Sequence, residues 1–201
     1  MNTELAEALR QHLEWLTSLG QKGKRLSRED ADLTAFNFSA MNLSEAELPG
    51  AHCDGCDLSE ADLYGAHLAS ASFAGANLTR TQLAKANLDH AVLRGATLMQ
   101  AKAFRASFYE ADLRGADLQG ADLRGAYFVN ANLESAILRG TQWEGAVMDG
   151  ARLLGADLTG ATGLHTVQAS WIDLGREGAP HRIEGAALAS WLARVASQSP
   201  A

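Results

Sequence analysis

The sequence is short of several residue types that most folded domains use freely. Its 201 residues include two cysteines and three prolines, and valine and isoleucine together occur only eight times. Two cysteines are too few for a disulfide scaffold. No apolar run approaches the roughly 20 residues of a membrane-spanning helix. Alanine (38), leucine (29) and glycine (19) instead make up nearly half of the chain.

Basic residues are also scarce relative to acidic ones. The formal net charge is -7 and the isoelectric point is about 5.3, whereas direct binding to nucleic acid or to an anionic membrane needs a basic surface. Neither is expected as a direct partner, while cationic proteins and DNA-binding proteins stay open. Glu4 and Glu7 lie where a signal peptide would be basic and then apolar. We expect a cytoplasmic protein, or one exported by a signal that this pattern does not reveal.

A five-residue repeat dominates the chain. From Ala31 to Gly160 the sequence reads as 26 consecutive pentapeptides without insertion or deletion. The third residue of each unit, here called the centre, is Leu in 18 units and Phe in four, and the first residue, here called the corner, is Ala in 21. A period of five fits neither a helix nor a strand, so the richness in Ala and Leu does not indicate helix.

The pattern predicts a solenoid in which each pentapeptide forms one short face. Successive coils would stack at about 4.8 Å, the spacing of β-strands, so that each coil pairs with the next. The centres would fill the axis, and the corners must be small because the cross-section is narrow. Aspartates at the second position are expected to bond turn backbone.

The repeat also resembles a known family. Units such as 111–115 (ADLRG) and 121–125 (ADLRG) follow the A(D/N)LXX pattern, so that residues 31–160 resemble the pentapeptide repeat proteins. The resemblance implies an all-β solenoid, a right-handed quadrilateral β-helix with four pentapeptides per coil. Twenty-six units would then give about 6.5 coils and a rod of about 31 Å.

Both ends of an open solenoid need a cover, because unpaired backbone invites polymerisation. Residues 1–30 are expected to form an N-terminal capping helix, with leucines at helical spacing over 3–19, followed by a solvated linker over 21–30. The leucine stripe could also bind a partner or a membrane, but its acidic neighbours favour a cap.

Residues 161–201 are expected to form the C-terminal cap. Two short strands are predicted over 169–174 and 181–183, followed by a helix over 185–197. Trp191 and Leu192 lie on the apolar side of this helix. They either close the last coil or form a homodimer interface, as the resemblance implies for family members that act on topoisomerases.

One motif is typical of zinc or redox chemistry, the CxxC of residues 52–56 (HCDGC). In the repeat register Cys53 is a centre and Cys56 a corner, both pointing inward, so we interpret the pair as core filling. His67 and His90 fall in different columns and show no nearby nucleophile. We therefore expect no enzyme, no metal site and no cofactor.

Sorting the units by the 20-residue period gives four faces, each named here by its first centre. The Leu33, Phe38 and Leu43 faces carry charges of -1, -2 and 0, whereas the Leu48 face carries -4 and no Lys or Arg. Exposed tyrosines are expected on this acidic face, and a second aromatic pair, Tyr64 and Phe104, on the Leu43 face. The candidate partner-binding residues are Glu47, Asp89, Tyr109, Glu110, Tyr127 and Asp149.

Two functions are consistent with this sequence. The first is a non-catalytic protein-binding rod that docks through the acidic face. Qnr-like members of the family mimic DNA, so the resemblance implies DNA gyrase or topoisomerase IV as a partner, although the carboxylates here are sparser than DNA phosphates. The second is a structural spacer with an unknown protein partner, whose acidic face only keeps the rod soluble.

Overall fold

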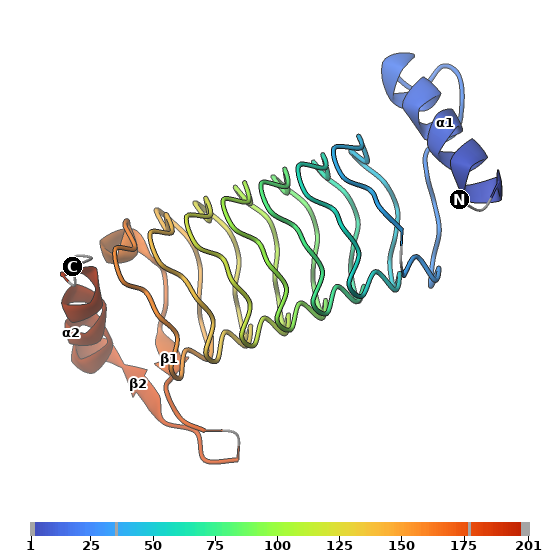
Figure 1. Cartoon of the computed structure of the whole chain (residues 1–201). Coiled ribbons are helices and arrows are strands. Elements are labelled where there is room, and N and C mark those ends of the chain that lie inside the picture. Colours follow the sequence, from blue (N-terminus) through green and yellow to red (C-terminus); the bar gives the residue numbers. More distant parts are fainter. Residues whose placement is uncertain (1–2, 35, 177, 198–201) are drawn as a thin grey trace.

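The computed structural model describes residues 3–34, 36–176 and 178–197 and forms an elongated rod (Figure 1). The expected helices and strands are confirmed within a few residues, with α1 at one end of the rod and α2 and a β-hairpin at the other (Figure 1). The elements are α1 (Thr3–Thr17), the 3₁₀ turn η1 (Leu164–Thr166), β1 (Trp171–Asp173), β2 (Arg182–Glu184) and α2 (Gly185–Ala196).

The rod between the caps is a stack of coils with a 20-residue period. Residues twenty apart are joined by parallel β-bridges, as in the column Asp32, His52 and Ser72, and four such columns run along the rod. The bridges begin at Ser27 and end at Asp173, so the paired region extends beyond residues 31–160 on both sides.

Backbone groups of one coil bond the coils above and below it. His52 bonds the preceding coil, because it donates its N–H to the carbonyl of Ala31 (2.8 Å) and accepts the N–H of Leu33 (2.8 Å) at its own carbonyl. The next residue, Cys53, donates its N–H to the carbonyl of Ser72 (2.7 Å) in the following coil. Side chains at the second position close the local turn, as where Asp57 Oδ1 accepts the N–H of Ser59 (3.0 Å). The expected bonding of second-position aspartates to turn backbone is therefore confirmed.

The core lies on the axis of the rod. Every centre from Leu33 to Leu158 is buried, and so is every corner from Ala46 to Ala151. The rings of Phe108 and Phe128 stack with centroids 4.8 Å apart, which matches the spacing of β-strands. The inward direction of centres and corners, predicted from the repeat alone, is confirmed.

Helix α1 covers the first coil through a buried histidine. His12 is fully buried, and its Nδ1 accepts the N–H of Leu26 (3.0 Å). Arg25 pairs with Glu47 (2.6 Å), and Arg28 pairs with Glu4 of the helix (2.9 Å). The expectation of a solvated linker over 21–30 is therefore wrong for its second half, which belongs to the first coil and its cap.

The register changes at the C-terminal end. Gln142 pairs with Thr162, twenty residues on, but Val147 pairs with Gln168, twenty-one residues on, and η1 lies between Thr162 and Gln168. Strand β1 serves both the last coil and the hairpin, because Asp173 bridges Arg152 in the rod and pairs with Arg182 of β2.

Candidate protein-binding face

The six candidate residues of the Leu48 face occupy three positions of the pentapeptide, and Glu110 is in the last of them, directly after Tyr109. Glu47 and Tyr127 belong to one bridge column, which continues through residues 67, 87 and 107. Asp89 and Tyr109 lie two positions further along their pentapeptides, one coil apart, and Asp149 lies two coils beyond Tyr109. The set spans five coil steps, which is about 24 Å at the spacing of β-strands.

Three of these residues meet in one place. The Tyr109 ring contacts the ring of His90 edge-on with centroids 5.5 Å apart. His90 Nδ1 lies 3.4 Å from Glu110 Oε2. The Asp89 carboxylate accepts hydrogen bonds from the Ser107 hydroxyl and from the N–H of Tyr109 (3.2 Å).

Tyr127 borders this group one coil further on, opposite Ser107. We call Asp89, His90, Tyr109, Glu110 and Tyr127 the Tyr109 cluster. Tyr109 is 37% and Tyr127 45% exposed. The hydrogen bond to Glu110 and its negative charge raise the pKa of Tyr109 above its ordinary value, so the hydroxyl stays protonated and neutral around pH 7.

The remaining two carboxylates of the face lie outside the cluster. Glu47 is held by Arg25 (2.6 Å) and lies 3.7 Å from His67. Arg25 precedes the repeats, so its positive charge is not part of the net charge of -4 that the pentapeptides of the Leu48 face carry. The N-terminal part of this face is therefore less acidic than the repeat sequence alone indicates. Asp149 accepts the N–H of Ser170 (2.5 Å) in the last coil, which gives it a structural role.

The CxxC motif lies inside the core. Cys53 and Cys56 are both buried, and the Cys56 thiol donates to the carbonyl of Leu33 (2.9 Å). Burial raises the pKa of Cys53 well above its usual range, which suppresses the reactive thiolate. The core-filling interpretation is confirmed. Across residues 3–34, 36–176 and 178–197, no cluster of three potential ligands for a metal ion occurs.

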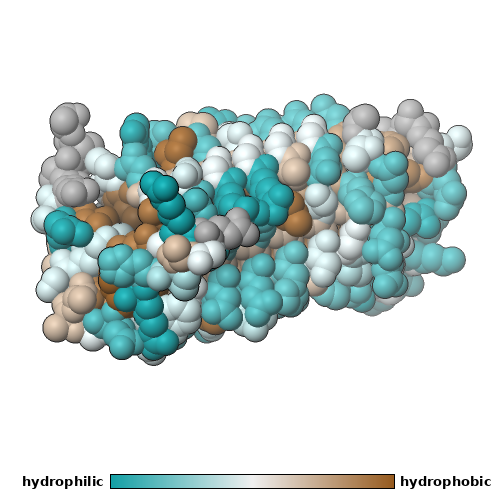
Figure 2. All heavy atoms as spheres, turned by 90° about the horizontal axis from the view of Figure 1, so that it is seen from below, coloured by the Kyte–Doolittle hydropathy of each residue, from teal (hydrophilic) through white to brown (hydrophobic). Residues whose placement is uncertain are grey.

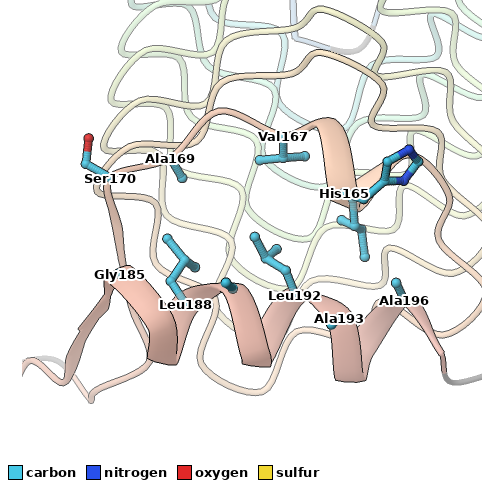
Figure 3. Close-up of a pocket in the computed structure, with 11 residues that line it drawn as sticks. His165, Val167, Ala169, Ser170, Gly185, Leu188, Leu192, Ala193 and Ala196 are labelled. Carbon is cyan, nitrogen blue, oxygen red and sulfur yellow. The ribbon is translucent and has the colours of Figure 1, made fainter.

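Trp191 and Leu192 pack, half-buried, within the chain's own C-terminal cap. Leu188 and Leu192 of α2 point toward Val167 and Ala169 of the last coil across a hollow of about 540 Å³ (Figure 3). Apolar surface gathers at this end, whereas the flank of the rod in the same view is mostly hydrophilic (Figure 2). The repeat pattern gave no sign of the hollow, because it forms where the register has ended.

Neither α1 nor α2, the two α-helices of the described part of the chain, has the length and apolar character needed to cross a membrane.

Among the solved structures that are similar to this chain, HetL supports the fold. HetL, a pentapeptide repeat protein involved in heterocyst differentiation regulation in the cyanobacterium Nostoc sp. strain PCC 7120, is 23% identical over 74% of this chain and 79% of its own, with a TM-score of 0.56. A trypsin-treated form of QnrB1, a plasmid-mediated fluoroquinolone resistance protein, is 22% identical over 72% and 78% of the two chains, with a TM-score of 0.35.

A pentapeptide repeat protein from the thylakoid lumen of Arabidopsis thaliana is 42% identical over 45% of this chain and 59% of its own, with a TM-score of 0.29. No curated protein sequence matches the chain. The family model of pentapeptide repeats matches residues 29–63, 61–100, 93–128, 106–141 and 126–162, and with the buried centres and 20-residue bridges this shows that the chain belongs to the pentapeptide repeat family.

Proposed function

We propose that the chain is a non-catalytic protein-binding rod that docks a partner through the Tyr109 cluster. The observation that carries the proposal is the pair of exposed tyrosines beside Asp89 and Glu110, on a face whose pentapeptides contain no Lys or Arg. Tyrosines supply apolar area with a polar tip, and carboxylates select a basic partner surface. The paired coils hold these groups on a rigid backbone, which lowers the ordering cost of binding.

A type II topoisomerase, DNA gyrase or topoisomerase IV, is the partner class proposed from the family resemblance, together with a cytoplasmic location. The low density of negative charge on the Leu48 face argues against close mimicry of DNA. B-DNA carries one charge per about 1.7 Å, hence about 14 charges over about 24 Å, whereas the Leu48 face has four carboxylates, of which Arg25 pairs with Glu47. The cluster therefore fits a few basic side chains better than an extended DNA-binding channel.

The family resemblance also supplies the finer shape that we propose for the rod, a right-handed β-helix of quadrilateral section with about 6.5 coils in the repeats. The four bridge columns per 20-residue coil support the four-sided section.

The cluster is tested with isosteric variants that remove charge but keep hydrogen-bond acceptors. Asp89→Asn with Glu110→Gln should reduce capture of the partner at least tenfold when wild type and variant are used as paired baits and bound proteins are quantified. Glu134→Gln with Asp117→Asn removes one carboxylate each from the Leu33 and Phe38 faces, outside the cluster, and should leave capture unchanged. Equal loss in both variants would point to net charge rather than to the cluster.

The topoisomerase version has its own assay. Purified protein at micromolar concentration should inhibit gyrase supercoiling or relieve drug-induced cleavage, and the Asp89→Asn/Glu110→Gln variant should do so at higher concentrations only. If wild type has no effect on either reaction of gyrase or topoisomerase IV, this partner class is wrong, while the protein-binding proposal still rests on the capture experiment.

The alternative is a spacer whose caps attach it to another protein or to a second copy. Trp191 and Leu192 already pack within their own cap, so a homodimer at this end has to use the outer side of α2. Sedimentation across a concentration series distinguishes the versions, because a spacer dimer forms equally well with the cluster variant.

A further inference from the structure

A second charged surface lies on the Leu43 face, in the middle of the rod. Lys85, Lys102 and Arg105 are exposed and occupy two consecutive coils. Among the described residues none of the three forms a salt bridge, and we call them the basic strip. Lys102 contributes to lowering the pKa of Asp122, but the Asp122 carboxylate is held by Arg124 at 2.7 and 2.8 Å.

Two exposed aromatic rings accompany the strip. Tyr64 is 41% and Phe104 42% exposed. The Lys85 ammonium lies 5.2 Å from the Tyr64 ring centroid and donates to its hydroxyl (2.8 Å), and the Arg105 guanidinium lies 5.8 Å from the Phe104 centroid. These contacts orient the cations without neutralising them.

A shallow polar groove adjoins the strip and shares Lys102 with it. Its volume is about 470 Å³, and its lining residues are Glu60, Arg80, Gln82, Gln100 and Lys102. Arg80 bonds Glu60 (2.8 Å) and Gln100 (3.4 Å), which fixes one wall of the groove. The glutamine amides carry both donors and acceptors, the complement of a peptide backbone.

We infer that the basic strip and this groove bind an extended acidic segment of a protein partner. The three cations without salt bridges match carboxylates in charge, the amides match main-chain N–H and C=O groups, and Tyr64 and Phe104 offer apolar contact. The negative charge of Glu60 in the groove would repel a continuous phosphate backbone, whereas a peptide whose carboxylates are spaced apart can bind without placing one next to Glu60. The net charge of -7 also disfavours a long polyanion, whereas screening over about 10 Å lets a short segment respond to the local cations.

This surface lies on a different face from the Tyr109 cluster, so the two proposals fail independently. The direct measurement is fluorescence anisotropy with a labelled decapeptide that alternates glutamate with serine and tyrosine. A second decapeptide carries glutamine in place of glutamate, and a ten-nucleotide oligothymidylate serves as the nucleic-acid probe.

Wild type should bind the acidic peptide at least tenfold more tightly than the glutamine peptide at about 50 mM salt, and added salt should weaken binding. The variant Lys85→Gln/Lys102→Gln/Arg105→Gln should lose at least tenfold in affinity while keeping its melting temperature, because all three side chains are exposed. The control Arg94→Gln/Arg114→Gln/Arg139→Gln removes the same charge from other faces and should bind within twofold of wild type.

Three results overturn the inference. The first is that wild type shows no preference for the acidic peptide over the glutamine peptide. The second is that the strip variant and the control variant lose the same affinity for the acidic peptide. The third is that wild type binds oligothymidylate more tightly than the acidic peptide, which would assign the surface to single-stranded nucleic acid.

Discussion

At the scale of single residues, position within the pentapeptide decides what each side chain does. Thr81 occupies a corner, and its hydroxyl donates to the carbonyl of Leu58 (2.9 Å), which is how a polar residue is accepted where alanine is usual. From unit 36–40 to unit 156–160, the last residue of each pentapeptide has positive φ, as at Ala40 (56°) and Gly115 (63°). This explains the glycine column, because only glycine adopts that conformation without a steric cost.

Enlarging a corner should overpack the axis. Ala86 is 1% exposed and faces the stacked centres, so Ala86→Leu should lower the free energy of unfolding by about 1–3 kcal/mol. Urea denaturation measures the change. The same substitution at Ala84, which is only half-buried, should change stability by less than about 0.5 kcal/mol; similar losses at both positions would contradict the packing argument.

The turn geometry predicts stability changes of opposite sign when glycine and alanine are exchanged at the last position of two pentapeptides. A methyl group added to Gly115 would meet no atom within 4 Å, so Gly115→Ala should cost about 1 kcal/mol through backbone strain alone. Ala40→Gly should instead be neutral or stabilising. Thermal melts of the two variants test this, and a stabilising Gly115→Ala would mean that the turn is not left-handed in solution.

At the scale of elements, α1 is coupled to the rod through one buried imidazole. His12 Nδ1 accepts the N–H of Leu26 and its ring stacks on Trp15 with centroids 6.0 Å apart. Burial is the main cause that lowers the pKa of His12 below its ordinary 6.5; Arg25 adds to this effect, while the Ser44 backbone and Glu45 oppose it. The cap therefore depends on a neutral histidine.

The stability of the cap should consequently fall in mild acid. The unfolded chain takes up a proton near pH 6.5 and folded His12 does so only at lower pH, so this contribution is constant above about pH 6.5 and falls below it, at up to about 1.4 kcal/mol per pH unit. Protection of α1 amides from hydrogen exchange, compared at about pH 7.5 and about pH 5.5 after correction for intrinsic rates, measures the loss.

A matched variant isolates the histidine. His12→Asn offers an acceptor for the Leu26 N–H without titrating in this range, so its protection should change less between the two pH values than that of wild type. His67→Asn alters an exposed histidine and should behave as wild type. An unchanged pH response in His12→Asn would remove His12 as the cause.

The elements show how far the sequence determines the structure. Inward Leu88 and the buried thiol of Cys53 follow from register alone, because a five-residue period leaves one direction for each position. The contact of His12 with Leu26 and the pairing of Arg25 with Glu47 do not follow, because both join a segment outside the repeat to the first coil.

The candidate site was only partly predictable for a related reason. The repeat places His90, Tyr109 and Glu110 on one face, but the edge-on ring contact and the approach of His90 to Glu110 depend on side-chain rotamers. A five-residue period fixes which way a side chain leaves the backbone and not where its far end lies.

At the scale of the whole molecule, the rod is a long ladder with two protected ends. Leu5 of α1 and Leu188 of α2 are both buried as part of the continuous core. Each end would otherwise present unpaired backbone and apolar centres, which is the arrangement that leads to edge-to-edge assembly.

Removal of the N-terminal cap should therefore convert a dispersed protein into an associating one. A chain that begins at residue 25 lacks α1, including Leu5 and His12, and leaves Leu26 uncovered. Light scattering should show concentration-dependent assembly of the truncated chain under conditions in which the full chain scatters as a single species. A truncated chain that stays monomeric and melts as the full chain does would show that α1 is not a cap.

The regular bridge spacing before η1 also means that the number of pentapeptides sets where the C-terminal elements lie and which way they point. Since four pentapeptides complete a coil, inserting one extra pentapeptide ahead of η1 would swing the hairpin and α2 by a quarter revolution with little gain in length. Inserting four pentapeptides would move the hairpin and α2 along the rod axis by one coil, about 4.8 Å, without changing their orientation. The length of the rod and the orientation of its C-terminal elements about the axis can thus be set separately, by how many five-residue units the gene encodes.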